Sequence, residues 1–321
     1  MRTPRRQFLG MMLAGTALAA GPLRAAGSRI SVVATTGMIA DAARQVGGDL
    51  VEVKGLMGPG VDPHAYRQTR TDIVALTRAD LVLWHGLYLE AQMEELLLKL
   101  AGRGNVVAVG EAVPEDELIG HEDYENKFDP HVWMVPDLWG HVVRAVEAAL
   151  SETAPEHAEA FAANAEAHLA AIGRLGEYAR KTLATVPEPA RVLLTAHDAF
   201  GYFGRSYGYE VIGIQGISTE SEAGLDRIKT LVDMLVSRQI GAVFVESSVS
   251  DRNMRALVEG AAAQGHEVKI GGELFSDAMG RPGSYEGTYV GMIDHNVSTI
   301  AGALGGDVPE RGMTGKLAAG S

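Results

Sequence analysis

Short apolar runs alternate with segments of helical periodicity along most of the chain, a pattern typical of a parallel α/β fold. In the first half, buried strands are predicted at residues 29–34, 50–57, 80–86 and 105–110. Helices are predicted between them, at residues 36–48, 67–79 and 90–102. Strands that alternate with helices favour a parallel sheet with helices on both faces.

The second half of the chain repeats this order. Strands are predicted at residues 190–196, 209–216, 240–247 and 266–272, and helices at residues 199–208, 224–239 and 252–265. Residues 34–56 and 195–216 also resemble each other weakly in sequence. Such a repeat predicts two copies of one α/β lobe.

A long helix is predicted between the repeats. The segment from Pro155 to Pro187 has no internal proline and is rich in the helix formers Ala, Glu and Leu. About 30 residues at about 1.5 Å each give a helix of about 45 Å. We therefore predict an α/β fold of two similar lobes, each a parallel sheet flanked by helices, joined by one long rigid backbone helix. The expected units are an N-terminal lobe at 26–136, a helical linker at 137–188 and a C-terminal lobe at 189–321.

Residues 1–25 have the character of an export signal. Arg5 and Arg6 precede a short apolar run and a small-residue cleavage region near Ala25 or Ala26. The run is too short for a stable membrane span, which needs about 20 apolar residues. The paired arginines favour a twin-arginine signal over an ordinary secretory signal.

Charge and the lack of cysteine narrow the function classes. Removal of residues 1–25 takes four of the 28 basic residues and none of the 41 acidic ones, which leaves a net charge of −17. Such a chain repels nucleic acid and anionic lipid. The sequence contains no cysteine, so it has neither disulfides nor a cysteine that could carry a lipid anchor. We expect a monomer that is free in the periplasm and does not bind nucleic acid.

The candidate chemistry begins with a tripeptide, Asp-Pro-His, that occurs twice and ends at His64 and at His131. Proline before histidine stiffens the backbone and keeps it out of a helix. His197 and Asp277 also follow predicted strands, and ligands of open α/β sheets lie beyond the carboxyl ends of strands. Three imidazoles and one carboxylate can form a four-coordinate cation site. His85, after another strand, is a rival ligand, and loop or helix-capping roles are open for each position.

Three acidic residues are candidates for orienting these ligands. Glu246 lies at the end of a predicted strand, and Asp62 and Asp129 belong to the two Asp-Pro-His motifs. Histidines that bind metals usually donate their second ring N–H to a carboxylate or carbonyl. The same carboxylates could instead cap helices or brace turns.

Five segments along the mature chain resemble the metal-binding receptors of zinc and manganese ABC transporters, the cluster A-I solute-binding proteins. The segments are "GPGVDPHAYRQT", "FDPHVWM", "LTAHDAFGYFGRSYG", "GISTESEAG" and "ELFSDAMG". The resemblance implies two lobes joined by one long helix, with the metal between them. It assigns the ligands to His64, His131, His197 and Asp277.

The resemblance implies a periplasmic protein that captures Zn²⁺ and delivers it to a membrane permease. Histidine at the third ligand position favours Zn²⁺, because manganese prefers more oxygen ligands, although Mn²⁺ stays an alternative. Release would have to disturb one ligand, and we expect the loop around Asp277 to move first. A zinc hydrolase is the alternative from another class, but the sequence has no H-E-x-x-H or G-x-S-x-G motif.

The loop before His131 departs from the pattern of many zinc receptors. They carry a histidine-rich insertion there, whereas residues 111–129 are acidic and contain only His121. This difference makes a periplasmic metallochaperone a candidate partner in addition to the permease.

Overall fold

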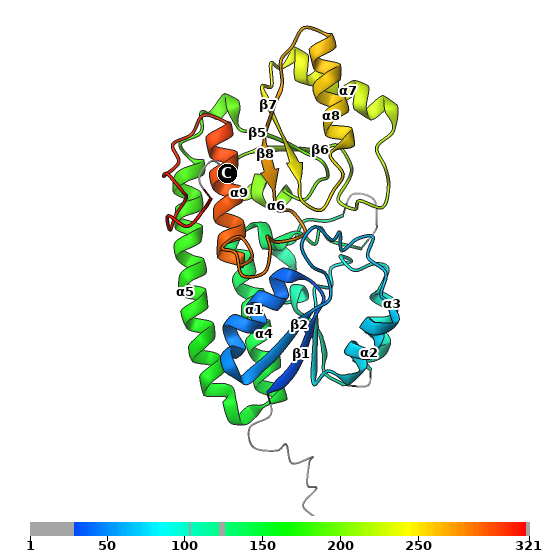
Figure 1. The fold of residues 1–321 in the computed structure, drawn as a ribbon, viewed down its shortest axis with the longest axis vertical. Coiled ribbons are helices and arrows are strands. Elements are labelled where there is room, and N and C mark those ends of the chain that lie inside the picture. Colours follow the sequence, from blue (N-terminus) through cyan, green and yellow to red (C-terminus); the bar gives the residue numbers. More distant parts are fainter. Residues whose placement is uncertain (1–28, 103, 122–125, 319–321) are drawn as a thin grey trace, which may run out of the picture.

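The computed structural model describes residues 29–102, 104–121 and 126–318, so the predicted export signal lies outside the described residues. Two lobes follow one another along the long axis of the molecule, and one long helix runs beside both (Figure 1). This arrangement confirms the predicted fold class. Within the described ranges, no helix has the length and apolar character needed to cross a membrane.

The N-terminal lobe contains a four-stranded parallel sheet in the order β2-β1-β3-β4. Its strands are β1 (Ile30–Ala34), β2 (Val51–Gly55), β3 (Leu81–Trp84) and β4 (Val106–Ala108). The helices beside it are α1 (Gly37–Gly47), α2 (Arg70–Arg78) and α3 (Glu94–Ala101). The two central strands are the most apolar, since helices cover a parallel sheet on both faces.

The C-terminal lobe contains two parallel strand pairs in place of one continuous ladder. They are β5 (Val192–Thr195) with β6 (Glu210–Gly213), and β7 (Ala242–Glu246) with β8 (Lys269–Leu274). The helices are α6 (Gly201–Tyr207), α7 (Leu225–Ser237) and α8 (Arg252–Ala263). Strand β8 ends later than predicted and is bulged against β7.

Three further helices pack beside the lobes, and one of them extends along both. They are α4 (Pro136–Thr153), α5 (Ala158–Leu183) and α9 (Tyr289–Ala303). The 26 residues of α5 span about 39 Å at about 1.5 Å each. The helix is shorter than predicted at both ends, because Pro155–His157 form a separate 3₁₀ turn and the helix ends at Leu183, before Pro187. Helix α5 packs against α1 and α4 in one lobe and against α9 in the other, so it braces both.

Helix α9 was not predicted, and its burial explains why. Buried residues occupy nearly every position along it, including the polar residues Asp294 and Asn296. A helix enclosed on all sides lacks the apolar stripe that marks an amphipathic helix in a sequence. Its close approach to the sheet also requires glycine at position 272, where a Cβ would lie 2.4 Å from Thr299 Cγ2.

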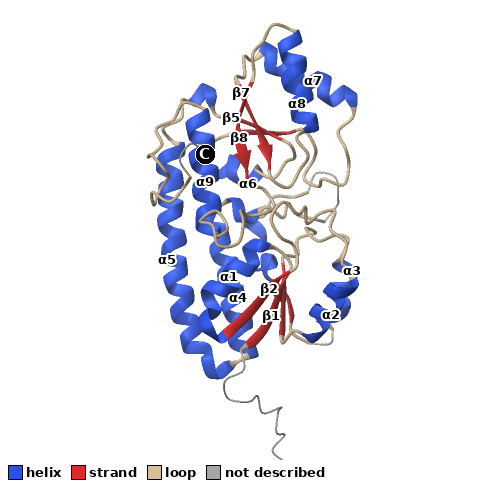
Figure 2. Cartoon of the chain, in the orientation of Figure 1, coloured by secondary structure: helices blue, strands red, loops and turns tan. Residues whose placement is uncertain are grey.

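The loops that leave the carboxyl ends of the strands meet between the two lobes (Figure 2). Parallel strands place all their carboxyl ends at one edge of a sheet, and the two lobes turn these edges toward each other. Residues that follow these strands therefore lie close to the junction of the lobes.

Candidate metal centre

Each of the four predicted ligands reaches the centre from a different loop. His64 lies between β2 and α2, and His131 directly precedes a short 3₁₀ turn (Val132–Met134) that leads into α4. His197 lies two residues beyond β5, and Asp277 lies three residues beyond β8. All four side chains are buried at the junction of the lobes, with relative exposures of 2% or less. The structure thus brings together every residue of the predicted set.

The ligand atoms lie at the spacing of a coordination shell. His131 Nε2 is 3.3 Å from both His64 Nε2 and His197 Nε2. Asp277 Oδ1 is 3.3 Å from His131 Nε2, and Asp277 Oδ2 is 3.2 Å from His197 Nε2 and 3.7 Å from His64 Nε2. A tetrahedral zinc site with bonds of about 2.05 Å has ligands about 3.3 Å apart. The four residues therefore need little rearrangement to surround one ion.

The carboxylate of Asp277 is buried and faces two imidazoles. Within the described residues neither oxygen makes a hydrogen bond of good geometry, and the contacts of 3.3 and 3.2 Å to Nε2 of His131 and of His197 are ion pairs only when those rings are protonated. A buried carboxylate is costly unless a positive charge lies beside it, which here comes from protonated rings or from a bound cation. A cation bound between Asp277 and the three imidazoles would satisfy both oxygens.

Two of the histidines are oriented by carboxylates. His131 Nδ1 lies 2.7 Å from Asp129 Oδ1, and His197 Nδ1 lies 2.6 Å from Glu246 Oε2. Each carboxylate also accepts the backbone N–H of the histidine that it orients. A proton on Nδ1 leaves the Nε2 lone pair directed at the centre, which is the tautomer that a metal needs.

When no metal is bound, the charges around the centre favour a second proton, and therefore a positive charge, on two of the three imidazole rings. Burial lowers the pKa of His131, but Asp129 and Asp277 outweigh burial and raise it to about 9. Burial likewise lowers the pKa of His197, and Glu246 and Asp277 outweigh it, so this pKa lies well above the usual value. Burial raises the pKa of Asp277, yet His197 and His131 hold it well below its usual range.

The pKa of His64 shifts in the opposite direction. Burial is the main cause and lowers it to about 3; Asp277 raises it in part, and the neighbouring imidazoles of His131 and His197 lower it further. His64 is therefore the ring that stays neutral in the metal-free centre. A metal ion binds His64 without displacing a proton, whereas binding at His131 and His197 displaces one from each.

Replacing Glu246 with glutamine should weaken metal binding by about 10- to 100-fold, the usual effect of losing an outer partner of a metal-bound histidine. The amide can still accept the Nδ1 hydrogen bond but no longer supplies a negative charge to the His197 ring. Competition with a chromophoric chelator would measure the change. Glu177→Gln, at an exposed position on α5, is the matched control. Equal affinities of the two variants would show that the Glu246 charge has no influence on the centre.

His85, the rival ligand, has another role. Its ring is fully buried, and its Nε2 lies 2.7 Å from the carbonyl oxygen of Pro130. The ring also packs edge-on against Trp133, with centroids 5.0 Å apart. His85 therefore supports the backbone immediately before His131 and does not join the four-residue centre.

Three supporting residues were not predicted, because their contacts join distant parts of the chain. Trp133 donates its indole N–H to the carbonyl of Ser276, at 2.8 Å, beside Asp277. Tyr202 donates its hydroxyl to the carbonyl of Asp129, at 2.7 Å. Thr219 donates its hydroxyl to Asp62 Oδ2, at 2.5 Å. Only Trp133 carried a signal in the sequence, since it lies two residues after a predicted ligand.

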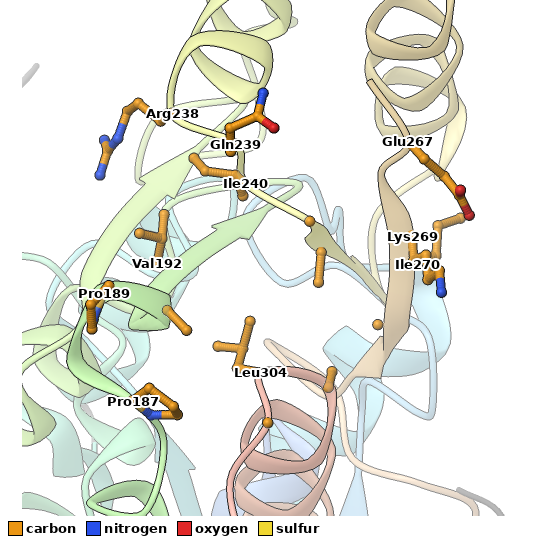
Figure 3. Close-up of a pocket in the computed structure, with 16 residues that line it drawn as sticks. Pro187, Pro189, Val192, Arg238, Gln239, Ile240, Glu267, Lys269, Ile270 and Leu304 are labelled. Carbon is orange, nitrogen blue, oxygen red and sulfur yellow. The ribbon is translucent and has the colours of Figure 1, made fainter. Parts of the chain in front are cut away.

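A separate cleft of about 910 Å³ lies at the opposite, amino end of the C-terminal strands (Figure 3). Its charged lining residues are Arg238, Glu267 and Lys269, and no histidine lines it. The guanidinium of Arg238 is already paired with Glu210, at 2.5 Å. This cleft offers no set of metal ligands and lies away from the edge that carries the four-residue centre.

The fold and the centre define a two-lobed receptor for a metal ion. Residues 32–303 match the family model described as zinc-uptake complex component A, periplasmic. The chain belongs to this family of metal-binding substrate-binding proteins of ABC transporters. It is therefore a transport receptor by family, and the hydrolase alternative has no support.

Similar proteins include receptors named for different metals. The chain is 49% identical to the manganese-binding lipoprotein MntA of Bacillus subtilis, over 88% of this chain and 92% of that protein. It is 46% identical to the zinc-binding protein TroA of Treponema pallidum, over 92% of this chain and 96% of that protein. The structure of that periplasmic zinc-binding protein superimposes with a TM-score of 0.84, covering 86% of this chain and 99% of the other.

Proposed function

We propose that this protein captures Zn²⁺ through His64, His131, His197 and Asp277 and delivers it to the permease of an ABC transporter. The observation that carries the proposal is the convergence of three imidazole Nε2 atoms on one buried carboxylate, with the four ligand atoms all within 4.8 Å of one another. Three nitrogen ligands and one oxygen ligand suit tetrahedral zinc. Two carboxylates that orient the rings support the same assignment.

Mn²⁺ is the second candidate, and one feature of the centre favours it. The two oxygens of Asp277 face different imidazoles, so the carboxylate could supply two ligand atoms. That would give five protein ligands, closer to the oxygen-rich, higher coordination of manganese. The similarity to a manganese-binding lipoprotein also supports this alternative.

We further propose that the mature protein is a monomer free in the periplasm. The chain contains no cysteine that could carry a lipid, and the paired Arg5 and Arg6 of its predicted export signal favour the twin-arginine type. The acidic segment before His131 supports loading by a periplasmic metallochaperone, because it lacks the histidines that could collect zinc directly.

Competition between the two metals tests the assignment. The mature protein is stripped of metal, dialysed against equal Zn²⁺ and Mn²⁺, and its metal content is measured by elemental analysis. We expect one zinc per chain, because zinc binds most nitrogen-containing sites more tightly than manganese does. Manganese retained in the presence of zinc would establish the alternative. A protein that retains neither metal would contradict the proposed function altogether.

A further inference from the structure

The two Asp-Pro-His motifs use their aspartates differently. In the second motif, Asp129 Oδ1 lies within hydrogen-bond distance of both the backbone N and the ring Nδ1 of His131, at 2.9 and 2.7 Å. In the first motif, Asp62 Oδ1 accepts the backbone N–H of His64, at 2.8 Å. The other oxygen, Oδ2, accepts the hydroxyl of Thr219, at 2.5 Å. Two identical tripeptides therefore differ in what holds their aspartate.

Thr219 belongs to the opposite lobe from Asp62. It lies in the loop between β6 and α7, residues 214–224, which we call the 214–224 loop. Within it, Gln215 Nε2 donates to the backbone carbonyls of Thr219 and Ser221, at 3.3 and 3.0 Å. Gln215 thus holds the loop in shape from within. The position of His64 consequently depends on an element that is not part of its own lobe.

The 214–224 loop contacts the N-terminal lobe at a second point. The side-chain amide of Gln92, between β3 and α3, donates to the carboxylate of Glu220. Thr219 and Glu220 are adjacent in sequence, so the two contacts form one bridge between the lobes. Thr219 and Asp62 are half-buried and Glu220 is exposed, which leaves the bridge within reach of water and of a docking protein.

The other ligands are held more firmly. The loop of Asp277 is fixed by Trp133, which donates to the Ser276 carbonyl at 2.8 Å. It is also fixed by Asn296 on α9, whose side chain accepts the Phe275 N–H at 2.9 Å and donates to the Phe275 carbonyl at 2.7 Å. This anchoring argues against our expectation that the Asp277 loop moves first.

We propose that the hydrogen bond from Thr219 to Asp62 is a latch that holds His64 in the closed centre and that metal release begins when it opens. Thr219 is then a positioning residue, acting on His64 through Asp62. When the 214–224 loop moves away, Asp62 loses its partner in the other lobe and the His64 backbone is no longer held against the centre. The inference rests on the proposed role of His64 as a metal ligand.

Replacing Thr219 with valine tests the latch, because valine keeps the shape of the side chain and removes the hydroxyl. A hydrogen bond to a carboxylate is among the stronger ones in proteins, so we expect Zn²⁺ to leave the variant roughly tenfold faster. The release rate is measured by stopped flow with excess chromophoric chelator. Thr219→Ser keeps the hydroxyl and should release Zn²⁺ at the wild-type rate.

Two further variants separate the latch from a general loss of stability. Thr153→Val removes the hydroxyl bound to the Ala149 carbonyl, at 2.8 Å, near the end of α4, and should leave the release rate unchanged. Asp62→Ala should release Zn²⁺ faster, and adding Thr219→Val to it should produce no further change, because Thr219 acts through Asp62. The melting temperature of the metal-free Thr219→Val variant should stay close to that of the wild type.

Three results would overturn the latch. The first is that Thr219→Val releases Zn²⁺ at the wild-type rate. The second is that Thr219→Ser releases Zn²⁺ as fast as Thr219→Val does. The third is that the Asp62 and Thr219 changes have independent, additive effects on the release rate. Each of these requires that the wild-type protein binds Zn²⁺. If the wild-type protein binds no metal, the proposed function fails, and that failure is distinct from failure of the latch.

Discussion

Replacing His131 with alanine should weaken metal binding by more than about a hundredfold. Loss of a residue that only orients a metal-bound histidine costs about 10- to 100-fold, and loss of a ligand itself should cost more. The Nε2 atom of His131 lies 3.3 Å from His64, from His197 and from Asp277, so it touches every other ligand of the centre. Its removal also leaves the buried carboxylates of Asp129 and Asp277 without their shared partner. Calorimetric titration with Zn²⁺ would measure the affinity.

Folding must be checked separately in this experiment, because unpaired buried charges destabilise a protein. Circular dichroism and thermal unfolding of the metal-free variant provide that check. His131→Asn, which keeps a polar side chain, is a milder second variant. His157→Ala, at the half-exposed turn before α5, is the control and should bind Zn²⁺ as the wild type does. A folded His131→Ala protein with wild-type affinity would remove this residue from the ligand set.

Apparent zinc affinity should rise steeply with pH above pH 7, and the rise should become shallower above the His131 pKa of about 9. The pKa of His131 is about 9 and that of His197 lies well above its usual value, so both rings carry a second proton at neutral pH. Zinc binds only the neutral imidazole, so it must displace the second proton of each ring. At a pH below the pKa of a ring, that displacement weakens the apparent affinity. Two displaced protons give a slope approaching two decades of affinity per pH unit. Metal retention should therefore fall as pH falls.

Calorimetry in buffers of different ionisation enthalpy would count the protons released. We expect about two per zinc ion at pH 7, one from each raised imidazole. Asp129→Asn removes a carboxylate that raises the pKa of His131, so in this variant the affinity should begin to rise less steeply at a lower pH. Asp49→Asn, at an exposed position, should leave the profile unchanged. An affinity that does not vary between pH 7 and pH 9 would contradict the protonation of the metal-free centre.

The alternation of apolar runs with helical segments was sufficient to predict the lobes, because each strand and helix is short and has a local period. Helix α9 was missed for the converse reason, since burial on all sides removes the period. The break between the two strand pairs of the C-terminal lobe also went unpredicted. Ladder hydrogen bonds depend on how strands from different parts of the chain pack, which local sequence patterns do not encode.

Three of the four proposed ligands were accessible from the sequence because each is tied to a local feature. His64 and His131 follow a proline, and His197 follows a buried strand, so their backbone positions depend on near neighbours. The rule that parallel strands share a carboxyl edge then predicts where the residues meet. Asp277 had the weakest local signal, and its assignment depended on the resemblance to a family.

The sequence by itself determined the two-lobed α/β architecture and the helix that joins the lobes, because these follow from short-range periodicity. It also made His64, His131 and His197 candidates through local backbone features, while the complete set with Asp277 came from the resemblance to a family. Only the tertiary structure decided which partners hold those residues. The contact of Glu246 with His197 joins residues 49 positions apart in the sequence. Trp133 and the Asp277 loop are joined across 143 positions, and Thr219 and Asp62 across 157. Contacts of that separation exist only once the lobes have packed, since no local backbone preference brings such side chains together.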